Sequence, residues 1–243
     1  MTALPNKNSE QSKKDQVEEM FNNISPKYDL LNHVLSANID KLWRKNAVNR
    51  LKPFKPQLIL DVATGTADFA VAATRINGAK VVGIDISEGM LEVGRRKIER
   101  KKLTDAIELI RADSENLPFE NDKFDAAIVG FGVRNFETLK IGLAEIKRVL
   151  KPGGVFYILE FSKPAKSPYK QIYQFYFTKI LPLIGRMVSK NNSAYTYLPE
   201  SVNEFPDGDK FLTILADVGF INNKCYLQTL GIASIYEAHK AKN

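Results

Sequence analysis

The sequence predicts an α/β fold in which helices cover both faces of a largely parallel sheet. Short apolar segments alternate with amphipathic helical segments over residues 57–162, which is typical of right-handed crossovers between parallel strands. The first apolar segment, LILDV, runs into a turn of five small residues, ATGTA (63–67). Aspartates stand at the ends of three successive apolar segments, at Asp61, Asp85 and Asp113.

The N-terminal region is predicted to be helical after a disordered tail. Residues 1–15 are polar and lack the apolar run of a secretory signal. Residues 16–52 carry apolar side chains at spacings of three and four, which predicts helices that form a lid. Pro53 and Pro56 mark the end of this region.

The central region, residues 53–164, is predicted to alternate between strands and helices. Strands are expected at residues 57–62, 80–85, 106–113, 123–132 and 154–162. Helices are expected at residues 67–76, 88–103 and 137–150. Ser87 is a suitable N-cap for the second of these helices.

The C-terminal third departs from this alternation. Residues 165–205 predict a helical insert rich in aromatic side chains. Residues 206–243 predict a last helix and two strands joined by a turn at Gly231. Residues 16–243 are therefore expected to form a single domain with seven strands.

The composition argues against several kinds of site. Cys225 is the only cysteine, and His33 and His239 are the only histidines, so neither a disulfide framework nor a metal site is expected. The formal net charge of +7 permits anionic partners without selecting one. The densest basic run, residues 95–102, is interpreted as a solvated helix face, and no nucleic-acid partner is expected.

The turn of small residues predicts a site for a nucleotide-type cofactor. In a doubly wound sheet, ligands bind beyond the carboxyl ends of the strands near the first strand, where the backbone must approach them closely. Asp85 follows the turn by roughly 20 residues, where a carboxylate accepts both hydroxyls of a ribose. Asp113 and Ser114 end the third strand, within reach of an adenine edge.

Asp61 favours a positively charged cofactor over a dinucleotide. Of the glycines expected in the dinucleotide turn G-x-G-x-x-G, only Gly65 is present, and a pyrophosphate would lie close to the Asp61 carboxylate. The ammonium and sulfonium groups of S-adenosylmethionine suit an acid at this position. The alternative is that Asp61 only caps the turn and the helix after it.

Five sequence blocks then occur in order: LDVATGTADFA, GIDISEGML, RADSENLPFENDKFDAAIVGFGVRN, EIKRVLKPGG and LEFSKP. Together they resemble the class I S-adenosylmethionine-dependent methyltransferases. With VEEMFNNISPKYDLLNHVLSANIDKLWRK and YTYLPESVNEFP, the chain is similar to the C-methyltransferases of menaquinone and ubiquinone biosynthesis over nearly all of its length after the tail. The resemblance implies the Rossmann-like class I fold, a seven-stranded mixed sheet whose last strand is antiparallel.

The resemblance also implies contacts to S-adenosylmethionine. The cofactor-binding residues are then Gly65, Thr66, Asp85, Asp113 and Ser114. Thr66 and the turn around Gly65 would hold the methionyl end, and Asp85 would hold the ribose. Asp113 would bind the adenine amino group, with Ser114 beside the ring.

Two positions depart from the family pattern. Ala67 stands where the family usually has glycine, which would tighten the turn. Gly130 stands where some relatives have a serine that touches the cofactor, so no side-chain contact is expected there.

The segment GFGVRN (130–135) follows the fourth strand and is predicted to carry the catalytic residues. A hydroquinone ring attacks from carbon when the neighbouring phenol is at least partly deprotonated. Arg134 could stabilise this oxyanion or hold a water that removes the proton, and Asn135 could orient either group. The alternatives are that Arg134 pairs with a local carboxylate and that Asn135 caps the next helix.

The reaction implied by the resemblance is C-methylation of a prenylated hydroquinone, with demethylmenaquinol to menaquinol preferred. One alternative is a polyprenyl-benzoquinol of ubiquinone biosynthesis, and another is a small-molecule methyltransferase with a different aromatic substrate. A basic RNA-binding protein with a degenerate cofactor fold is the alternative from another class. The tetrapeptide Asn/Asp-Pro-Pro-Tyr/Phe, typical of enzymes that methylate amino nitrogens of adenine or glutamine, is absent after the fourth strand.

The insert offers a candidate path for the prenyl chain. Within residues 169–188, the apolar side chains include Tyr173, Phe175, Tyr176, Phe177, Ile180, Leu181, Leu183 and Ile184, with basic residues among them. This composition suits a helical lid on an anionic membrane surface and equally a lid packed dry against the sheet. A cytoplasmic protein is expected, with peripheral contact at the inner face of the membrane and oligomerisation both left open.

Three residues of the N-terminal helices are interpreted separately. Tyr28 and His33 are expected to have structural roles, with the alternative that they line the substrate pocket. Trp43 lies on an apolar helical stripe and is predicted to be part of the core.

Overall fold

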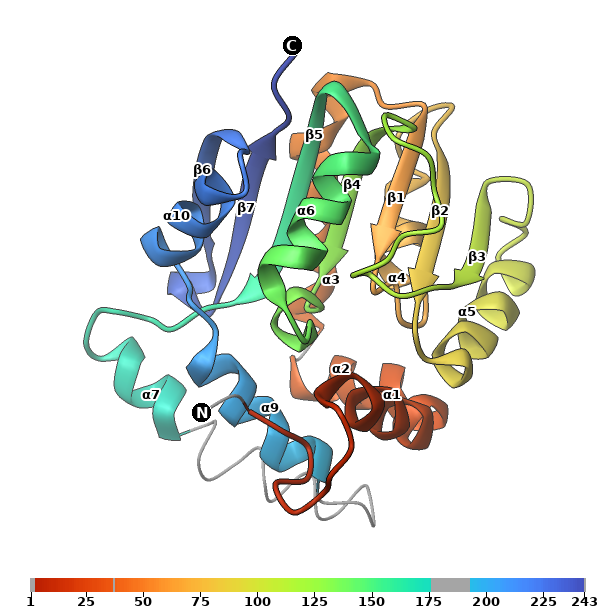
Figure 1. Cartoon of the computed structure of the whole chain (residues 1–243). Coiled ribbons are helices and arrows are strands. Elements are labelled where there is room, and N and C mark those ends of the chain that lie inside the picture. The colour runs from red at the N-terminus through yellow and green to blue at the C-terminus, as the bar shows by residue number, and fades with distance from the viewer. Residues whose placement is uncertain (1–2, 37, 176–192, 243) are drawn as a thin grey trace.

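A seven-stranded sheet organises the chain (Figure 1). The computed structural model describes residues 3–36, 38–175 and 193–242. The strands are β1 (Leu58–Val62), β2 (Lys80–Asp85), β3 (Ile107–Arg111), β4 (Phe124–Gly130), β5 (Leu150–Phe161), β6 (Ile221–Gln228) and β7 (Ala233–His239). They lie in the order β3-β2-β1-β4-β5-β7-β6, with β1 to β5 parallel and β7 antiparallel to both of its neighbours. The predicted mixed sheet with an antiparallel last strand is confirmed.

Both faces of the sheet are buried, as is typical of parallel strands with helical crossovers. The consecutive residues Ile59 and Leu60 of β1 are both fully buried, but they belong to apolar cores on opposite faces. The helices over the Ile59 face are α3 (Ile39–Leu51), α4 (Asp68–Ala73) and α5 (Glu88–Arg100), and those over the Leu60 face are α6 (Leu139–Val149) and α10 (Asp209–Asp217). The Ser87 hydroxyl accepts from the Met90 N–H and caps α5 as predicted.

Further helices lie beyond the carboxyl ends of the parallel strands (Figure 1). They include α1 (Lys13–Ile24), α2 (Tyr28–Leu35) and α9 (Ser193–Glu204). Short 3₁₀ turns occur at Ser25–Lys27, Lys52–Phe54, Val133–Asn135 and Thr229–Gly231.

The segment before α1 differs from the disordered tail predicted for residues 1–15. Helix α1 already begins at Lys13, and Ala3 is buried against Val17 and Tyr197. Lys7 forms an ion pair with Glu200 at 3.0 Å. These partners in α9 are almost two hundred positions away in the sequence, so local polarity gives no sign of them.

The helical insert predicted at residues 165–205 contains α7 (Tyr169–Phe175) and α9. Tyr173 is buried with Val202, whereas Phe175 is exposed. The remaining residues of the predicted prenyl path lie outside the described part of the chain: Tyr176, Phe177, Ile180, Leu181, Leu183 and Ile184. Among the helices of residues 3–36, 38–175 and 193–242, none has the length and apolar character needed to cross a membrane.

Trp43 belongs to the core, as predicted. Its side chain is 3% exposed on α3, and its indole Nε1 donates to the Thr229 hydroxyl at 2.7 Å. Cys225 is a half-buried free thiol, and the side chain of His33 lies outside what the structure describes. Within the described residues there is no cluster of three or more His, Cys, Asp or Glu that could hold a metal ion.

Strand β6 forms one edge of the sheet, and its pairing with β7 is irregular. The register shifts between Ile221 and Lys224. Asn222, inside this irregularity, has a left-handed backbone with φ 54°. The bulge bends the outer strand near its start and leaves Ile221 exposed.

Candidate active site

A cavity lies at the carboxyl ends of the parallel strands, under the N-terminal helices, and its volume of about 710 Å³ includes space open to solvent. Helices α1 and α2 contribute Lys14, Val17, Phe21 and Tyr28 to its lining. The rest of the lining comes from the strand ends, the loops after them and α5: Ala63, Gly65, Ile84, Asp85, Ile86, Met90, Ala112, Asp113, Ser114, Glu115, Gly130, Phe131, Gly132, Asn135, Phe136 and Glu137. Of the predicted site residues, the structure brings together Gly65, Asp85, Asp113, Ser114 and Asn135. Thr66 and Arg134 are outside this lining.

The turn at residues 63–67 has a left-handed backbone at alternate positions. The φ angles are 51° at Ala63, 56° at Gly65 and 65° at Ala67. A side chain at Gly65 would point towards the ring of Tyr28, whose Cε1 lies 3.9 Å from the position of a Cβ. Ala67, which replaces the family's usual glycine, adopts the glycine-like conformation at a cost of about 1 kcal/mol.

Asp61 is fully buried beneath this turn and does not line the cavity. Its Oδ2 accepts from the Thr64 hydroxyl at 2.6 Å, and its Oδ1 has no hydrogen-bond partner among the described residues. Burial raises the pKa of this carboxyl to about 7. The structure therefore shows Asp61 bound to the turn through Thr64 and not facing the cavity, whereas no side chain caps the helix that follows.

Asp85 ends β2 at the wall of the cavity. Its Oδ2 accepts from the Gly65 N–H at 2.8 Å, and its Oδ1 accepts from the Ser87 N–H at 2.9 Å. Burial raises the pKa of Asp85 to about 6, although these N–H groups favour the charged form. A carboxylate has about four lone-pair sites, so Asp85 keeps capacity for the two hydroxyls of a ribose.

Asp113 and Ser114 line the cavity beyond β3. Asp113 Oδ1 accepts from the Glu115 N–H at 2.8 Å, and Oδ2 pairs with the Lys14 ammonium at 3.1 Å. Lys14 was not expected here, because it falls in the stretch predicted to be a tail. Its ammonium contacts the Asp113 oxygen that does not accept from the Glu115 N–H.

The Thr66 hydroxyl is engaged away from the cavity. The side chain is buried, and its Oγ1 donates to Asp29 Oδ1 at 2.5 Å and accepts from Lys97 Nζ at 3.0 Å. A contact of Thr66 with the methionyl end of the cofactor stays a prediction. Because the hydroxyl is engaged elsewhere, the backbone of Thr66 would have to make this contact.

Arg134 forms a buried ion pair with Glu160 at the end of β5. Its Nη1 lies 2.7 Å from Glu160 Oε1 and also donates to the Phe131 carbonyl, and its Nε donates to the Ser201 hydroxyl at 3.3 Å. Pairing with a local carboxylate was the alternative to a catalytic role for Arg134, and the structure shows this pairing. Whether Arg134 also acts in catalysis stays a prediction.

Asn135, in contrast, lines the cavity. Its Oδ1 accepts from the Tyr197 hydroxyl at 3.0 Å, and its Nδ2 donates to the Phe131 carbonyl at 3.4 Å. The next helix begins at Leu139 with Thr138 at the N-cap position, so Asn135 does not cap it. Tyr28 also lines the cavity, which is the alternative left open for that residue.

Sequence reasoning missed two buried charged residues near the site. Glu160 is fully buried, its Oε2 has no hydrogen-bond partner among the described residues, and burial raises its pKa. Lys97 is only 6% exposed, whereas its neighbours Arg95 and Arg96 in the basic run are exposed as predicted. Two features of the sequence indicate that these side chains are buried. Glu160 stands inside an apolar strand, and Lys97 stands three positions after Gly94 on the buried stripe of α5.

The sequence profile of the ubiE/COQ5 methyltransferase family matches residues 9–240. The chain is 47% identical over 229 residues to a demethylmenaquinone methyltransferase of Bacteroides fragilis, covering 94% of each chain. It is 46% identical over 230 residues to a ubiquinone/menaquinone biosynthesis C-methyltransferase UbiE of Geotalea daltonii, covering 94% of this chain and 97% of that protein.

Solved structures of similar shape show the fold. A SAM-dependent methyltransferase from Thermotoga maritima gives a TM-score of 0.65 at 17% identity, covering 92% of this chain and 99% of that one. A SAM dependent methyltransferase from Aquifex aeolicus gives a TM-score of 0.57 at 18% identity, covering 79% and 88%. The predicted class I methyltransferase fold is confirmed.

We predict that binding of S-adenosylhomocysteine weakens as the pH falls through about 6, because protonation of Asp85 removes the charged acceptor for the ribose hydroxyls. Asp85→Asn should weaken binding about tenfold or more at pH 8 and abolish this pH dependence. Titration calorimetry between pH 5 and 8 measures both effects. Asp217→Asn, which alters an exposed acid paired with Lys140, serves as the control. Equal pH dependence in the protein with and without Asp85 would contradict the assignment.

We predict that Asp61 makes the folded protein less stable as the pH rises. Its folded pKa of about 7 lies above its ordinary value, so the native state binds more protons than the unfolded state between these two values. This single group should lower the free energy of unfolding by up to about 1.4 kcal/mol per pH unit as the pH rises towards 7. Urea unfolding at several pH values should show a shallower fall for Asp61→Asn than for the unsubstituted protein. Parallel curves would refute the shift.

Proposed function

Since this chain belongs to the ubiE/COQ5 methyltransferase family, we propose that it catalyses S-adenosylmethionine-dependent C-methylation of demethylmenaquinol to menaquinol. Relatives from Bacteroides fragilis, Porphyromonas gingivalis and Staphylococcus haemolyticus are named demethylmenaquinone methyltransferase, at 47%, 41% and 39% identity. The relatives named UbiE keep methylation of a polyprenyl-benzoquinol as the second candidate.

One observation carries the proposal. Asp85 and Asp113, expected to hold the adenosine, line the same cavity as Asn135, expected to act on the hydroquinone. The cavity wall also includes Phe21 and Tyr28 from the N-terminal helices. A methyl donor and an aromatic ring could therefore meet in a space that these helices shield from water.

The residues present fit S-adenosylmethionine. The bare backbone at Gly65 permits close approach of the methionyl end, and four carboxylates in the lining favour a ligand with positive charge: Asp85, Asp113, Glu115 and Glu137. When bound, the cofactor supplies an electrophilic methyl group on a sulfonium. The chain's part is to hold the ribose at Asp85 and to keep this methyl group facing the hydroquinone.

Asn135 is proposed to orient a hydroxyl of the hydroquinone. Its amide is fixed by the Tyr197 hydroxyl and the Phe131 carbonyl, so its position is set before substrate binds. Arg134, the preceding residue, is held in one orientation by Glu160 outside the cavity lining, and its guanidinium is proposed to favour the phenolate by charge rather than by contact. The phenol would give its proton to water, and the ring carbon beside the phenolate would form a bond to the methyl carbon as the carbon–sulfur bond breaks and S-adenosylhomocysteine leaves. Loss of the proton on that ring carbon to water would restore the aromatic ring.

Peripheral contact with a membrane is proposed as the way in which a prenylated substrate reaches the cavity. The turn Thr229–Gly231 lies against α3, because Trp43 donates to Thr229. The side chains of Leu42 on α3, Leu230 in the turn and Leu227 near the end of β6 are 52%, 61% and 69% exposed. Exposed leucines of this kind insert readily into the boundary between head groups and acyl chains.

The proposed reaction is tested by complementation of a bacterial mutant that lacks quinone C-methylation. Mass spectrometry of the lipid quinones should show methylated menaquinone in cells that express the chain and the demethyl form in cells that express Asp85→Ala. In a host that makes both quinones, the ubiquinone precursor reports separately on the second candidate. Accumulation of demethylmenaquinone in cells that contain folded, unsubstituted protein would refute the proposal.

We predict that Arg134 and Asn135 act on turnover more than on cofactor binding. Asn135→Ala and Arg134→Met should lower kcat about 100-fold or more, because each removes a group that stabilises the developing phenolate. The affinity for S-adenosylhomocysteine should change less than about threefold, since neither side chain is expected to touch the cofactor. Thermal melting checks that the Arg134 variant keeps its fold despite the loss of the ion pair. A rise in KM with unchanged kcat would contradict these roles.

A further inference from the structure

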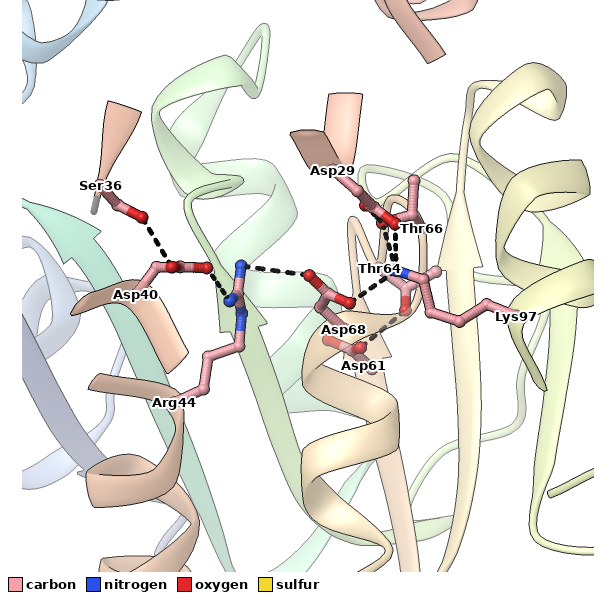
Figure 2. Close-up of polar contacts among 9 residues, drawn as sticks. All are labelled: Asp29, Ser36, Asp40, Arg44, Asp61, Thr64, Thr66, Asp68 and Lys97. Atoms are coloured by element: carbon pink, nitrogen blue, oxygen red, sulfur yellow. Dashed lines mark hydrogen bonds and ion pairs between the residues drawn. The ribbon is translucent and has the colours of Figure 1, made fainter. Parts of the chain in front are cut away.

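A second polar cluster lies at the turn of residues 63–67, and its side chains are outside the cavity lining (Figure 2). Its centre is the ammonium group of Lys97, from α5. Lys97 Nζ lies 2.6 Å from Asp68 Oδ1, 2.7 Å from Asp29 Oδ2 and 3.0 Å from Thr66 Oγ1. An ammonium has three N–H donors, so these three contacts use its full capacity.

The cluster continues from Asp68 into α3. Arg44 forms an ion pair with Asp40 on the same helix and lies 3.9 Å from Asp68 Oδ2. The Ser36 hydroxyl donates to the other Asp40 oxygen at 2.6 Å. Figure 2 shows these side chains as one chain of contacts that runs from α3 through Asp68 to Lys97.

The position of Lys97 follows from the packing of α5 on the sheet. The buried stripe of α5 consists of Met90, Leu91, Gly94, Lys97 and Ile98. A Cβ at Gly94 would lie 2.8 Å from Leu109 Cδ1, which is too close for a real contact. Glycine at this position therefore lets the helix approach β3 more closely than any other residue would. The next turn of the stripe therefore places the long Lys97 side chain under the start of α4.

Two of the three acceptors of Lys97 adjoin residues that line the cavity. Asp29 follows Tyr28, and Thr66 follows Gly65. The Thr66 hydroxyl also donates directly to Asp29 at 2.5 Å. Lys97 therefore joins the helix that carries Tyr28 to the turn that carries Gly65. These two residues are neighbours in the cavity lining.

We infer that Lys97 is a positioning residue, whose ammonium holds helix α2 on the cofactor turn and thereby sets the spacing between Tyr28 and Gly65. A buried ammonium is stabilised only by well-placed partners, so the three acceptors and the cation fix one another's positions. The inference rests on the proposed function in one respect, that the cavity is where S-adenosylmethionine binds. Lys97 itself is not expected to touch the cofactor.

The first test uses hydrogen exchange on the protein without ligand. Lys97→Met keeps a flexible apolar chain and removes the ammonium. Peptides that cover residues 25–36 and 63–70 should exchange about tenfold faster than in the unsubstituted protein. Arg95→Met is the matched control, because Arg95 lies on the same helix in an exposed pair with Glu88 and should leave both peptides unchanged. Unchanged exchange in Lys97→Met, or faster exchange spread evenly over the whole chain, would overturn the inference.

The second test measures binding and turnover. Lys97→Met should weaken S-adenosylhomocysteine about tenfold and raise KM for S-adenosylmethionine similarly, with kcat within about threefold. Asp29→Asn should have a similar effect, and the double variant should be little weaker than either single one, because both remove the same link. Additive effects, or a loss of kcat at unchanged KM, would overturn the inference. If Lys97→Met does not fold, Asp29→Asn replaces it in both tests, because Asp29 is a half-exposed partner of the same ammonium.

The two hypotheses fail in different ways. If the unsubstituted protein bound no S-adenosylhomocysteine, the proposed function would fail, whereas exchange in the ligand-free protein would still decide whether Lys97 holds α2 on the turn. If the unsubstituted protein binds and Lys97→Met binds equally well, only the positioning role fails.

Discussion

The hydrogen bond from the Gly65 N–H to the Asp85 carboxylate is the interaction on which the site depends. It joins the turn after β1 to the end of β2, so that two neighbouring parallel strands present their loops at one fixed separation. The other oxygen of Asp85 accepts from the Ser87 N–H, where α5 begins. One carboxylate therefore fixes the turn, the start of a helix and its own place in the cavity wall. Because its pKa is raised only to about 6, it carries the charge that these N–H groups favour at neutral pH.

The turn separates two environments, and its sequence Thr64-Gly65-Thr66 reflects both. The two threonine hydroxyls donate to carboxylates, Thr64 to the fully buried Asp61 and Thr66 to the half-exposed Asp29. The residue between them has no side chain and leaves its backbone at the cavity. Small residues at this strand end thus allow a ligand to approach closely on one side and bind acidic side chains on the other. A ligand that binds at the cavity therefore meets a surface held in place from behind.

Much of the fold and about half of the site's chemistry follow from local sequence patterns. Parallel strands end at a common edge, so the periodicity that predicts β2 and β3 also brings Asp85 and Asp113 to one cavity. The place of Asn135 at the cavity could be predicted because it lies in the loop that follows β4. The contacts that could not be predicted join distant segments: Lys14 with Asp113, Glu160 with Arg134, and Lys97 with Asp29. Each of these contacts depends on the direction in which a side chain leaves its helix or strand, and on neighbouring elements that are known only from the folded structure. The local sign of such a contact in the sequence is a charged residue at a position where the pattern predicts burial.

The irregular edge at β6 bears on how copies of the chain meet at high concentration. A long, flat outer strand would present a row of free N–H and C=O groups to another sheet and invite fibrous association. Here the register shift between Ile221 and Lys224, with the left-handed Asn222 inside it, interrupts that row near the start of the strand. The lysine adds a charge that a second strand would have to desolvate. Growth of the sheet from one molecule into the next is thereby disfavoured at this border.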